Sequence, residues 1–159
     1  STHGNCTSPD TCVCDDGYGL DNCSVPICFD ILRTNSSVCS THGSCIIPDK
    51  CDCDSTYTGF NCSFPICFGV PSIDTAVCSS HGVCQNPDYC ECDSTYTGPN
   101  CSIPICFNIP SNETTVCSGN GNCSNPDTCV CNEGYGLNNC SKPICFNILS
   151  TNSSVCSTH

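Results

Sequence analysis

The chain has 159 residues, of which 24 are cysteine, and it contains neither methionine nor tryptophan. Its 15 acidic residues against three basic ones give a net charge of −12, which disfavours nucleic acid and anionic membrane surfaces as partners. No apolar run approaches the length of a membrane span and no signal-peptide pattern opens the chain, so we expect no membrane contact by this segment.

The cysteines recur with a period of 39 residues in the pattern C-x10-C-x5-C-x5-C-x-C-x8-C, followed by a four-residue gap. In chain order, residues 1–23 supply the last four cysteines of a unit, residues 28–62, 67–101 and 106–140 are complete units, and residues 145–159 supply the first two cysteines of another. We call these segments modules 1 to 5. Each is too short to bury a sufficient core, so the sequence predicts covalent staples in its place.

Cysteine at this density predicts a disulfide scaffold, although zinc arrays and metallothionein-like chains also contain many cysteines. Zinc sites favour C-x2-C or C-x4-C pairs with histidine, and no C-x2-C pair occurs. A metallothionein-like chain would fit the C-x-C pairs, yet it would be rich in lysine and lack an aromatic framework. Disulfides therefore remain the favoured interpretation, and they imply an oxidising compartment, so we expect a secreted or cell-surface protein.

Two motifs resemble the epidermal growth factor (EGF) family. Ser-Thr-His-Gly-Ser at 40–44 lies between a second and a third cysteine, and the C-x-C pair is followed by Asp-Asp-Gly-Tyr at 15–18 and by Asn-Glu-Gly-Tyr at 132–135. The abutting joints, such as Cys-Ser-Phe-Pro-Ile-Cys at 62–67, are similar to those of tenascin-like tandem EGF arrays. Thr56 and Thr95 depart from the pattern, because glycine is usual there.

The resemblance implies a small disulfide-rich fold, a linear array of EGF-like modules made of short antiparallel β-hairpins. It also implies that the first cysteine of a module pairs with the third, the second with the fourth and the fifth with the sixth. The expected disulfides are Cys14 to Cys23, Cys28 to Cys45, Cys39 to Cys51, Cys53 to Cys62, Cys67 to Cys84, Cys78 to Cys90, Cys92 to Cys101, Cys106 to Cys123, Cys117 to Cys129 and Cys131 to Cys140. The cysteines alone would allow fifteen pairings in each module.

Regular structure is expected to be sparse. Short antiparallel strands are predicted to flank Tyr18, Tyr57, Tyr96 and Tyr135. Turns containing Pro-Asp are predicted at residues 8–10, 47–49, 86–88 and 125–127.

The joints between modules share the sequence Pro-Ile-Cys-Phe, as at residues 26–29. A four-residue joint that contains proline spans at most about 14 Å, so neighbouring modules must touch or nearly touch. We expect Ile27 and Phe29 to pack against Tyr18 of the preceding module; the alternative is that both are internal to one module. Either way the pattern predicts a rod in which units contact only their neighbours.

The sequence offers few candidates for catalytic or metal-binding residues. His3, His42 and His81 occupy the same turn of successive modules, but Asn120 replaces them in module 4, and we interpret them as solvated turn residues rather than metal ligands or acid-base groups. Once the pairing closes, no free cysteine remains in a complete module as a nucleophile, and no Ser-His-Asp arrangement can be singled out. We predict no catalytic residue and no metal site.

Calcium is a common ligand at the joints of EGF arrays, where an acidic cluster precedes the first cysteine. Here residues 24–27, 63–66, 102–105 and 141–144 contain no carboxylate, the hard oxygen ligand that calcium needs. We therefore expect a calcium-independent array without a cofactor.

N-glycosylation sequons recur throughout the chain. They lie at Asn5, Asn22, Asn35, Asn61, Asn100, Asn112, Asn122, Asn139 and Asn152. Four of them, spaced by 39 residues, read Asn-Cys-Ser around the last cysteine of a module; the alternative is that asparagine merely suits a turn there and that the central cysteine makes a poor acceptor. We expect N-linked glycans, and Ser44 fits the weaker O-fucose pattern of the EGF family.

Two functions compete for a non-enzymatic array of this kind. It could be a structural subunit of an extracellular glycosylated fibre or cell-surface appendage, or the stalk or ligand-binding ectodomain of an adhesion protein. Residues 1–42 and 118–159 are identical at 32 of 42 positions, as expected of a long array grown by duplication. The expected partners are the chain itself, by continuation or by head-to-tail or lateral assembly, and other surface proteins or glycans.

Overall fold

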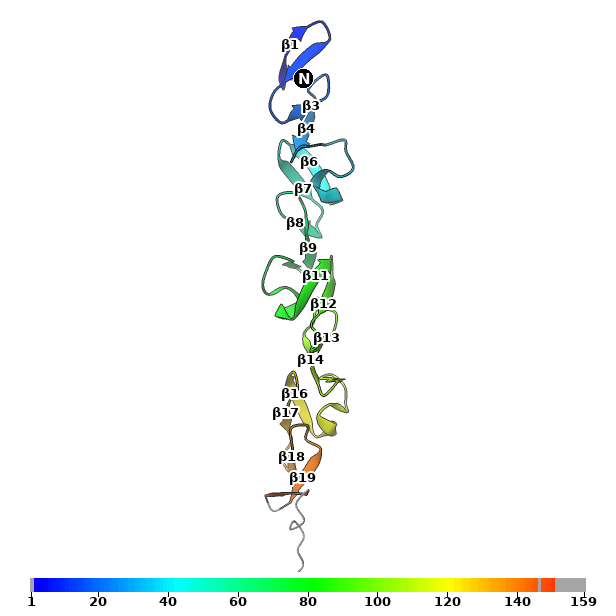
Figure 1. The fold of residues 1–159 in the computed structure, drawn as a ribbon, viewed down its shortest axis with the longest axis vertical. Helices are drawn as coiled ribbons and strands as arrows, with labels where there is room; N and C mark the ends of the chain where they lie inside the picture. Colours follow the sequence, from blue (N-terminus) through cyan, green and yellow to red (C-terminus); the bar gives the residue numbers. More distant parts are fainter. Residues whose placement is uncertain (1, 146, 151–159) are drawn as a thin grey trace, which may run out of the picture. The chain divides into compact units, whose positions relative to one another are not determined.

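The computed structural model describes residues 2–145 and 147–150. The chain divides into two compact units, one of Ser1–Val77 with Cys84–Asp88 and the other of Cys78–Val83 with the chain from Tyr89 onward. In each unit the described residues form short antiparallel strands and single-turn 3-10 helices (Figure 1). Because the division passes through module 3, each of the four joints between modules lies within one unit.

The elements repeat in the same order in each module. The first part of the chain contains β1 (Gly4–Ser8), β2 (Thr11–Cys14), β3 (Tyr18–Gly19), β4 (Val25–Cys28), β5 (Ile31–Leu32), η1 (Val38–Thr41), β6 (Gly43–Ile47), β7 (Lys50–Cys53), β8 (Tyr57–Thr58), β9 (Phe64–Cys67) and β10 (Val70–Pro71). It continues with η2 (Val77–Ser80), β11 (Gly82–Asn86), β12 (Tyr89–Cys92), β13 (Tyr96–Thr97), β14 (Ile103–Cys106), β15 (Ile109–Pro110), η3 (Val116–Gly119), β16 (Gly121–Asn125), β17 (Thr128–Cys131), β18 (Tyr135–Gly136), β19 (Lys142–Cys145) and β20 (Ile148–Leu149).

The longest hairpin of module 2 joins β6 to β7. Cys45 lies opposite Cys51, and a register shift follows between Cys45 and Ile47. Pro48 presets the backbone for the turn, and Asp49 adopts a left-handed φ of 54°, a conformation that aspartate tolerates better than most residues. The predicted Pro-Asp turn is therefore present, and its aspartate has the same left-handed φ in the other modules at Asp10, Asp88 and Asp127.

Disulfide-bonded cysteines make up most of the buried core of each module. In module 2 the buried cluster consists of Cys28, Val38, Cys39, Cys45 and Cys62. The matching cluster of module 4 consists of Cys106, Val116, Cys117, Cys123 and Cys140. Within the described residues no polar or charged residue is buried. A module this small thus depends on covalent bonds for stability that a larger domain would draw from apolar burial.

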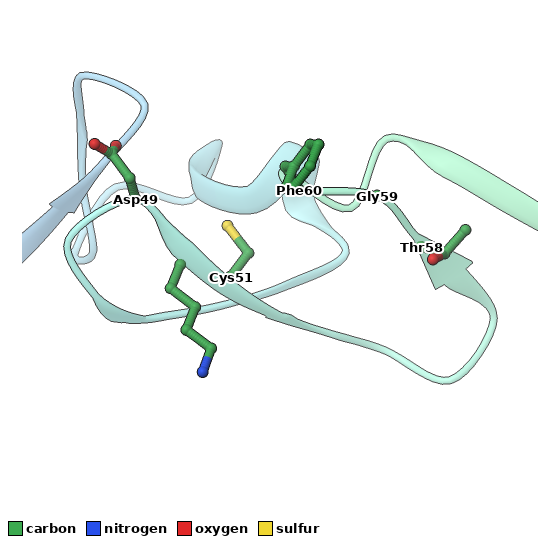
Figure 2. A pocket seen from close by; sticks show the side chains of 6 residues that line it. Asp49, Cys51, Thr58, Gly59 and Phe60 are labelled. Atoms are coloured by element: carbon green, nitrogen blue, oxygen red, sulfur yellow. The ribbon is translucent and has the colours of Figure 1, made fainter.

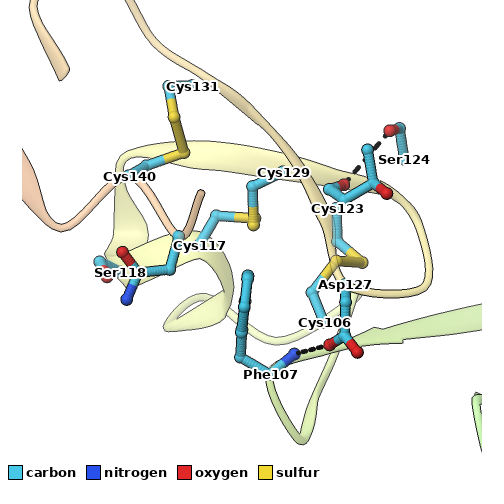
Figure 3. Close-up of a disulfide and its surroundings, with 12 residues drawn as sticks. Cys106, Phe107, Cys117, Ser118, Cys123, Ser124, Asp127, Cys129, Cys131 and Cys140 are labelled. Carbon is cyan, nitrogen blue, oxygen red and sulfur yellow. Dashed lines mark hydrogen bonds between the residues drawn. A yellow bond between two sulfur atoms is a disulfide. The ribbon is translucent and has the colours of Figure 1, made fainter. Parts of the chain in front are cut away.

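Ten disulfides join the described cysteines, and in each complete module they link first to third, second to fourth and fifth to sixth. They are Cys14–Cys23, Cys28–Cys45, Cys39–Cys51, Cys53–Cys62, Cys67–Cys84, Cys78–Cys90, Cys92–Cys101, Cys106–Cys123, Cys117–Cys129 and Cys131–Cys140. Figure 3 shows the three bridges of module 4, which link the hairpin of β16 and β17 to Cys106 of β14, to Cys117 of η3 and to Cys140. Among the described residues, free thiols remain at Cys6, Cys12 and Cys145.

No helix within the described ranges combines the length and the apolar character that crossing a membrane requires.

Candidate functional site: the joint between modules

The joint between modules 1 and 2 is a three-stranded antiparallel sheet. The joint strand β4 pairs on one side with β3 of module 1 and on the other with β5 of module 2. The Ile27 amide donates to the Gly17 carbonyl at 2.7 Å, and the Arg33 amide donates to the Pro26 carbonyl at 3.0 Å. The backbone of one module therefore continues directly into the sheet of the next.

The same sheet recurs at every joint of the described chain. Its strands are β8, β9 and β10 at the second joint, β13, β14 and β15 at the third, and β18, β19 and β20 at the fourth. Because two antiparallel ladders share one strand, a neighbouring module cannot turn freely about its joint without breaking backbone hydrogen bonds.

A two-residue turn of unusual composition connects the joint strand β4 to β5. Phe29 and Asp30, at its centre, have φ angles of 52° and 64°. Two positive φ angles in succession match a type I′ hairpin turn, which follows the natural twist of the strands. Aspartate, glycine or asparagine suits the second position, but a phenylalanine with positive φ is uncommon and needs a local reason.

That reason is a hydrogen bond from the turn to the next hairpin. The Phe29 amide donates to Asp49 Oδ1 at 2.7 Å, and the Asp49 amide donates to the Ile27 carbonyl at 3.1 Å. Asp49 thus binds the backbone on both sides of Cys28. The bond from phenylalanine to aspartate recurs at 2.7 Å between Phe68 and Asp88 and between Phe107 and Asp127, the latter drawn in Figure 3.

The turns of adjacent modules also touch directly. Gly17 has a φ of +82°, and a Cβ atom placed on it would lie 2.5 Å from the Cβ of Pro48 in module 2. Glycine is needed here for its backbone conformation and for the close approach of the proline. The prediction that neighbouring modules touch or nearly touch is therefore met at this joint.

The side chains that we expected to form the joint occupy other places. The residue opposite Tyr18 in the register of β3 and β4 is Pro26. Ile27 lies opposite Leu32 of the next module, and the Phe29 side chain is 40% exposed at the turn. Backbone pairing, which side-chain patterns do not reveal, is the main connection between the modules.

The histidines have a ring partner that their positions in the sequence do not reveal. His42 stacks on Tyr57 with ring centroids 3.6 Å apart and an interplanar angle of 4°. His3 on Tyr18 and His81 on Tyr96 make the same contact at 3.8 and 3.5 Å. These histidines do lie in bends, as expected, but they are only partly exposed and cover the tyrosine that begins the joint sheet.

The described sequons lie at the surface or partly exposed. Asn5, Asn22, Asn35, Asn112 and Asn122 are exposed, whereas Asn61, Asn100 and Asn139 are half-buried. Near the joints, Asn22 Oδ1 accepts a hydrogen bond from the Ser24 amide at 3.2 Å, and Asn100 Oδ1 accepts one from the Ser102 hydroxyl at 2.8 Å. Ser44 is exposed on β6, and Asn152 lies outside the described residues.

Close groups of sulfur atoms do not offer a metal site. The sulfur atoms of Cys28, Cys39 and Cys51 lie within 4.8 Å of one another, as do their equivalents in modules 3 and 4. Each of these atoms belongs to a disulfide, whereas zinc binds the thiolate form. An open depression beside this cluster is lined by Lys50, Thr58 and Phe60, and Phe60 as a whole residue is 89% exposed (Figure 2).

The hairpins, the ten disulfides and the repeated joint together define the class: the chain is a tandem array of EGF-like modules. A family model described as a teneurin-like EGF domain matches residues 76–104, from just before the second cysteine of module 3 into the following joint. No curated protein matches the chain. The EGF-like fold and its disulfides indicate an extracellular protein built from structural modules.

Proposed function

We propose that the chain is a structural segment of a glycosylated extracellular fibre or cell-surface appendage, in which EGF-like modules follow one another as stiff spacers. The observation that supports this function is the joint sheet, which recurs at all four joints with the same register. A chain that keeps each joint in one conformation suits a load-bearing or spacing role better than a flexible tether does.

The joint also supports a proposal about calcium. The residues of the joint strands between the two disulfides, such as 24–27, carry no carboxylate, and backbone ladders with the Asp49 contact hold the strand in place. We therefore include in the proposal that the fibre keeps its form without bound calcium.

Glycans complete the proposed fibre. The sequons Asn22, Asn61, Asn100 and Asn139 recur once per module beside a joint, so attached glycans would form a hydrated sheath along the fibre. Such a sheath would keep neighbouring fibres from associating through exposed apolar side chains such as that of Phe60.

Electron microscopy of the native protein tests the function, with the mass measured after reduction and the glycans mapped by enzymatic release in heavy-oxygen water. We expect filaments whose axial repeat equals a whole number of modules, unchanged by a calcium chelator, with carbohydrate at the four joint sequons. Discrete particles that end in a separate head domain or a membrane anchor would overturn the fibre and favour the stalk of an adhesion protein.

A further inference from the structure

The four joints fall into two kinds according to the residue after the tyrosine. Joints 1 and 4, residues 18–32 and 135–149, have glycine there, and joints 2 and 3, residues 57–71 and 96–110, have threonine. We call them glycine joints and threonine joints. The backbone pairing is the same in both kinds, so any difference in which following module a joint can accept must come from side-chain size.

In the glycine joints the space beside the glycine is filled by a leucine of the next module. A Cβ atom on Gly19 would lie 2.7 Å from Leu32 Cδ2, and one on Gly136 would lie 2.7 Å from Leu149 Cδ2. Real Cβ atoms do not approach other heavy atoms this closely, so a larger residue in place of the glycine would require the half-buried leucine side chain to move. Neither glycine has a left-handed φ, so the contact with leucine, and not the backbone conformation, is what favours glycine here.

In the threonine joints the incoming strand carries a smaller residue at the matching position. Thr58 and Thr97 have the side chain that Gly19 lacks, and the residues that correspond to Leu32 are Pro71 and Pro110. A proline ring closes onto its own backbone nitrogen and does not project as far as the Cδ atoms of leucine. The proline therefore leaves room for the threonine where leucine would collide with it.

The next position along the chain also differs between the two kinds of joint. Gly59 and Gly98 follow the threonines, and Cβ atoms on them would lie 2.6 Å from Phe64 Cδ2 and 3.0 Å from Ile103 Cδ1. The glycine joint has Leu20 at this position. In both kinds of joint one of these two positions carries glycine and the other a larger side chain, and their order is reversed between the two kinds.

Common descent explains part of this pattern, because residues 1–42 and 118–159 are identical at 32 of 42 positions. The two glycine joints therefore count as one independent case, whose physical basis is the 2.7 Å approach.

We infer that the end of each module selects its successor by side-chain size. A module that ends in Tyr-Gly-Leu accepts a next module that has Ile-Leu in the strand after its first turn. A module that ends in Tyr-Thr-Gly accepts a next module that has Val-Pro or Ile-Pro in that strand. The partner is another module of this same array. The inference concerns the order of the modules, and it stands whether or not the array forms a fibre.

The test uses single and double substitutions in the full chain. Leu32 lies opposite Ile27 in a pair without mutual hydrogen bonds, since the Ile27 amide donates to Gly17 and the Arg33 amide donates to Pro26. Leu32→Pro therefore removes no bond of the ladder. Amide hydrogen exchange at Ile27 and Arg33 reports on joint 1, and the unaltered joint 2 serves as the internal control.

We expect Gly19→Thr to raise exchange at both amides by about tenfold or more, because the new side chain meets Leu32, and Gly19→Thr with Leu32→Pro to return exchange to within about threefold of the original. If Gly19→Thr prevents folding, the reciprocal pair decides the matter: Pro71→Leu should loosen joint 2, and Thr58→Gly with Pro71→Leu should restore it. The inference would be overturned if the effects of the two substitutions in a joint simply add. It would also be overturned if the single variants leave the joint unchanged.

Discussion

Modules 2 and 4 share a frame of disulfides and backbone hydrogen bonds but differ in one contact. In module 2 the His42 ring stacks on Tyr57; in module 4 the side-chain amide of Asn120 donates instead to the carbonyls of Ser118 and Cys140, at 3.0 and 3.4 Å. The backbone bond made by this residue's carbonyl hardly changes, at 2.9 Å in module 2 and 2.8 Å in module 4. The disulfides and the backbone ladder therefore set the frame, and the side chain at this position adds to it.

Removal of the first disulfide would have the largest effect and would test whether the frame is indeed common to both modules. We expect Cys28→Ser with Cys45→Ser to destabilise module 2 by about 2–5 kcal/mol, and the matching change at Cys106 and Cys123 to cost module 4 a similar amount. Each bridge closes the same separation of 17 residues. The measurement is the opening free energy of each module from amide exchange.

Two outcomes bear on that comparison. A clearly smaller loss in module 2 than in module 4 would show that the stack of His42 on Tyr57 supports the frame itself. Cys6→Ser is the control, because Cys6 is an exposed free thiol, and we expect a change within about 0.5 kcal/mol.

Loss of the aspartate contact at the joint would have the next largest effect. Asp49→Ala removes the acceptor of the Phe29 amide, and Asp127→Ala does the same for Phe107. A hydrogen bond to a charged group contributes about 1.5–3 kcal/mol, but both aspartates are exposed, so we expect a loss of about 1 kcal/mol at each joint. Faster exchange of the two phenylalanine amides measures it.

Asparagine at position 49 provides the matched control, because its side-chain oxygen can still accept the bond. Asp49→Asn should weaken the turn less than Asp49→Ala does. Equal effects of the two variants would show that charge alone, and not the bond to Phe29, matters at this place.

Exchange of the differing residue between the modules would have the smallest effect. We expect His42→Asn to destabilise module 2 and Asn120→His to stabilise module 4, each by about 0.5–1 kcal/mol, since a stacked ring pair adds about this much beyond its buried area. Ring-current shifts of Tyr57 and Tyr135 in the NMR spectrum would report whether a stack is lost or formed. Stabilisation without such a shift at Tyr135 would argue against stacking as the cause.

The sequence predicts the module class well, because the cysteine spacing repeats without slippage and proline with aspartate marks each hairpin turn. It does not predict the stack of His42 on Tyr57, since the two residues are far apart in the chain and Tyr135 occurs without a histidine partner. The left-handed Phe29 also escapes prediction, because turn statistics favour other residues there. Its signal lay in the next residue, which is aspartate, glycine or asparagine in each repeat.

The sulfur bridges also determine how the array would respond to tension. A pull along the chain passes from Cys28 through its bridge to Cys45, along the backbone to Cys53, and through the second bridge to Cys62. The bridges bypass 17 and 9 of the 39 residue steps in a period, which leaves 13 steps that can straighten. Even with every hydrogen bond broken, a module would lengthen to only about 55 Å, including the two bridges, instead of the roughly 130 Å of an uncrosslinked stretch. Tensile strength in this chain is thus covalent, and a reducing agent would roughly double the length to which a module can be stretched.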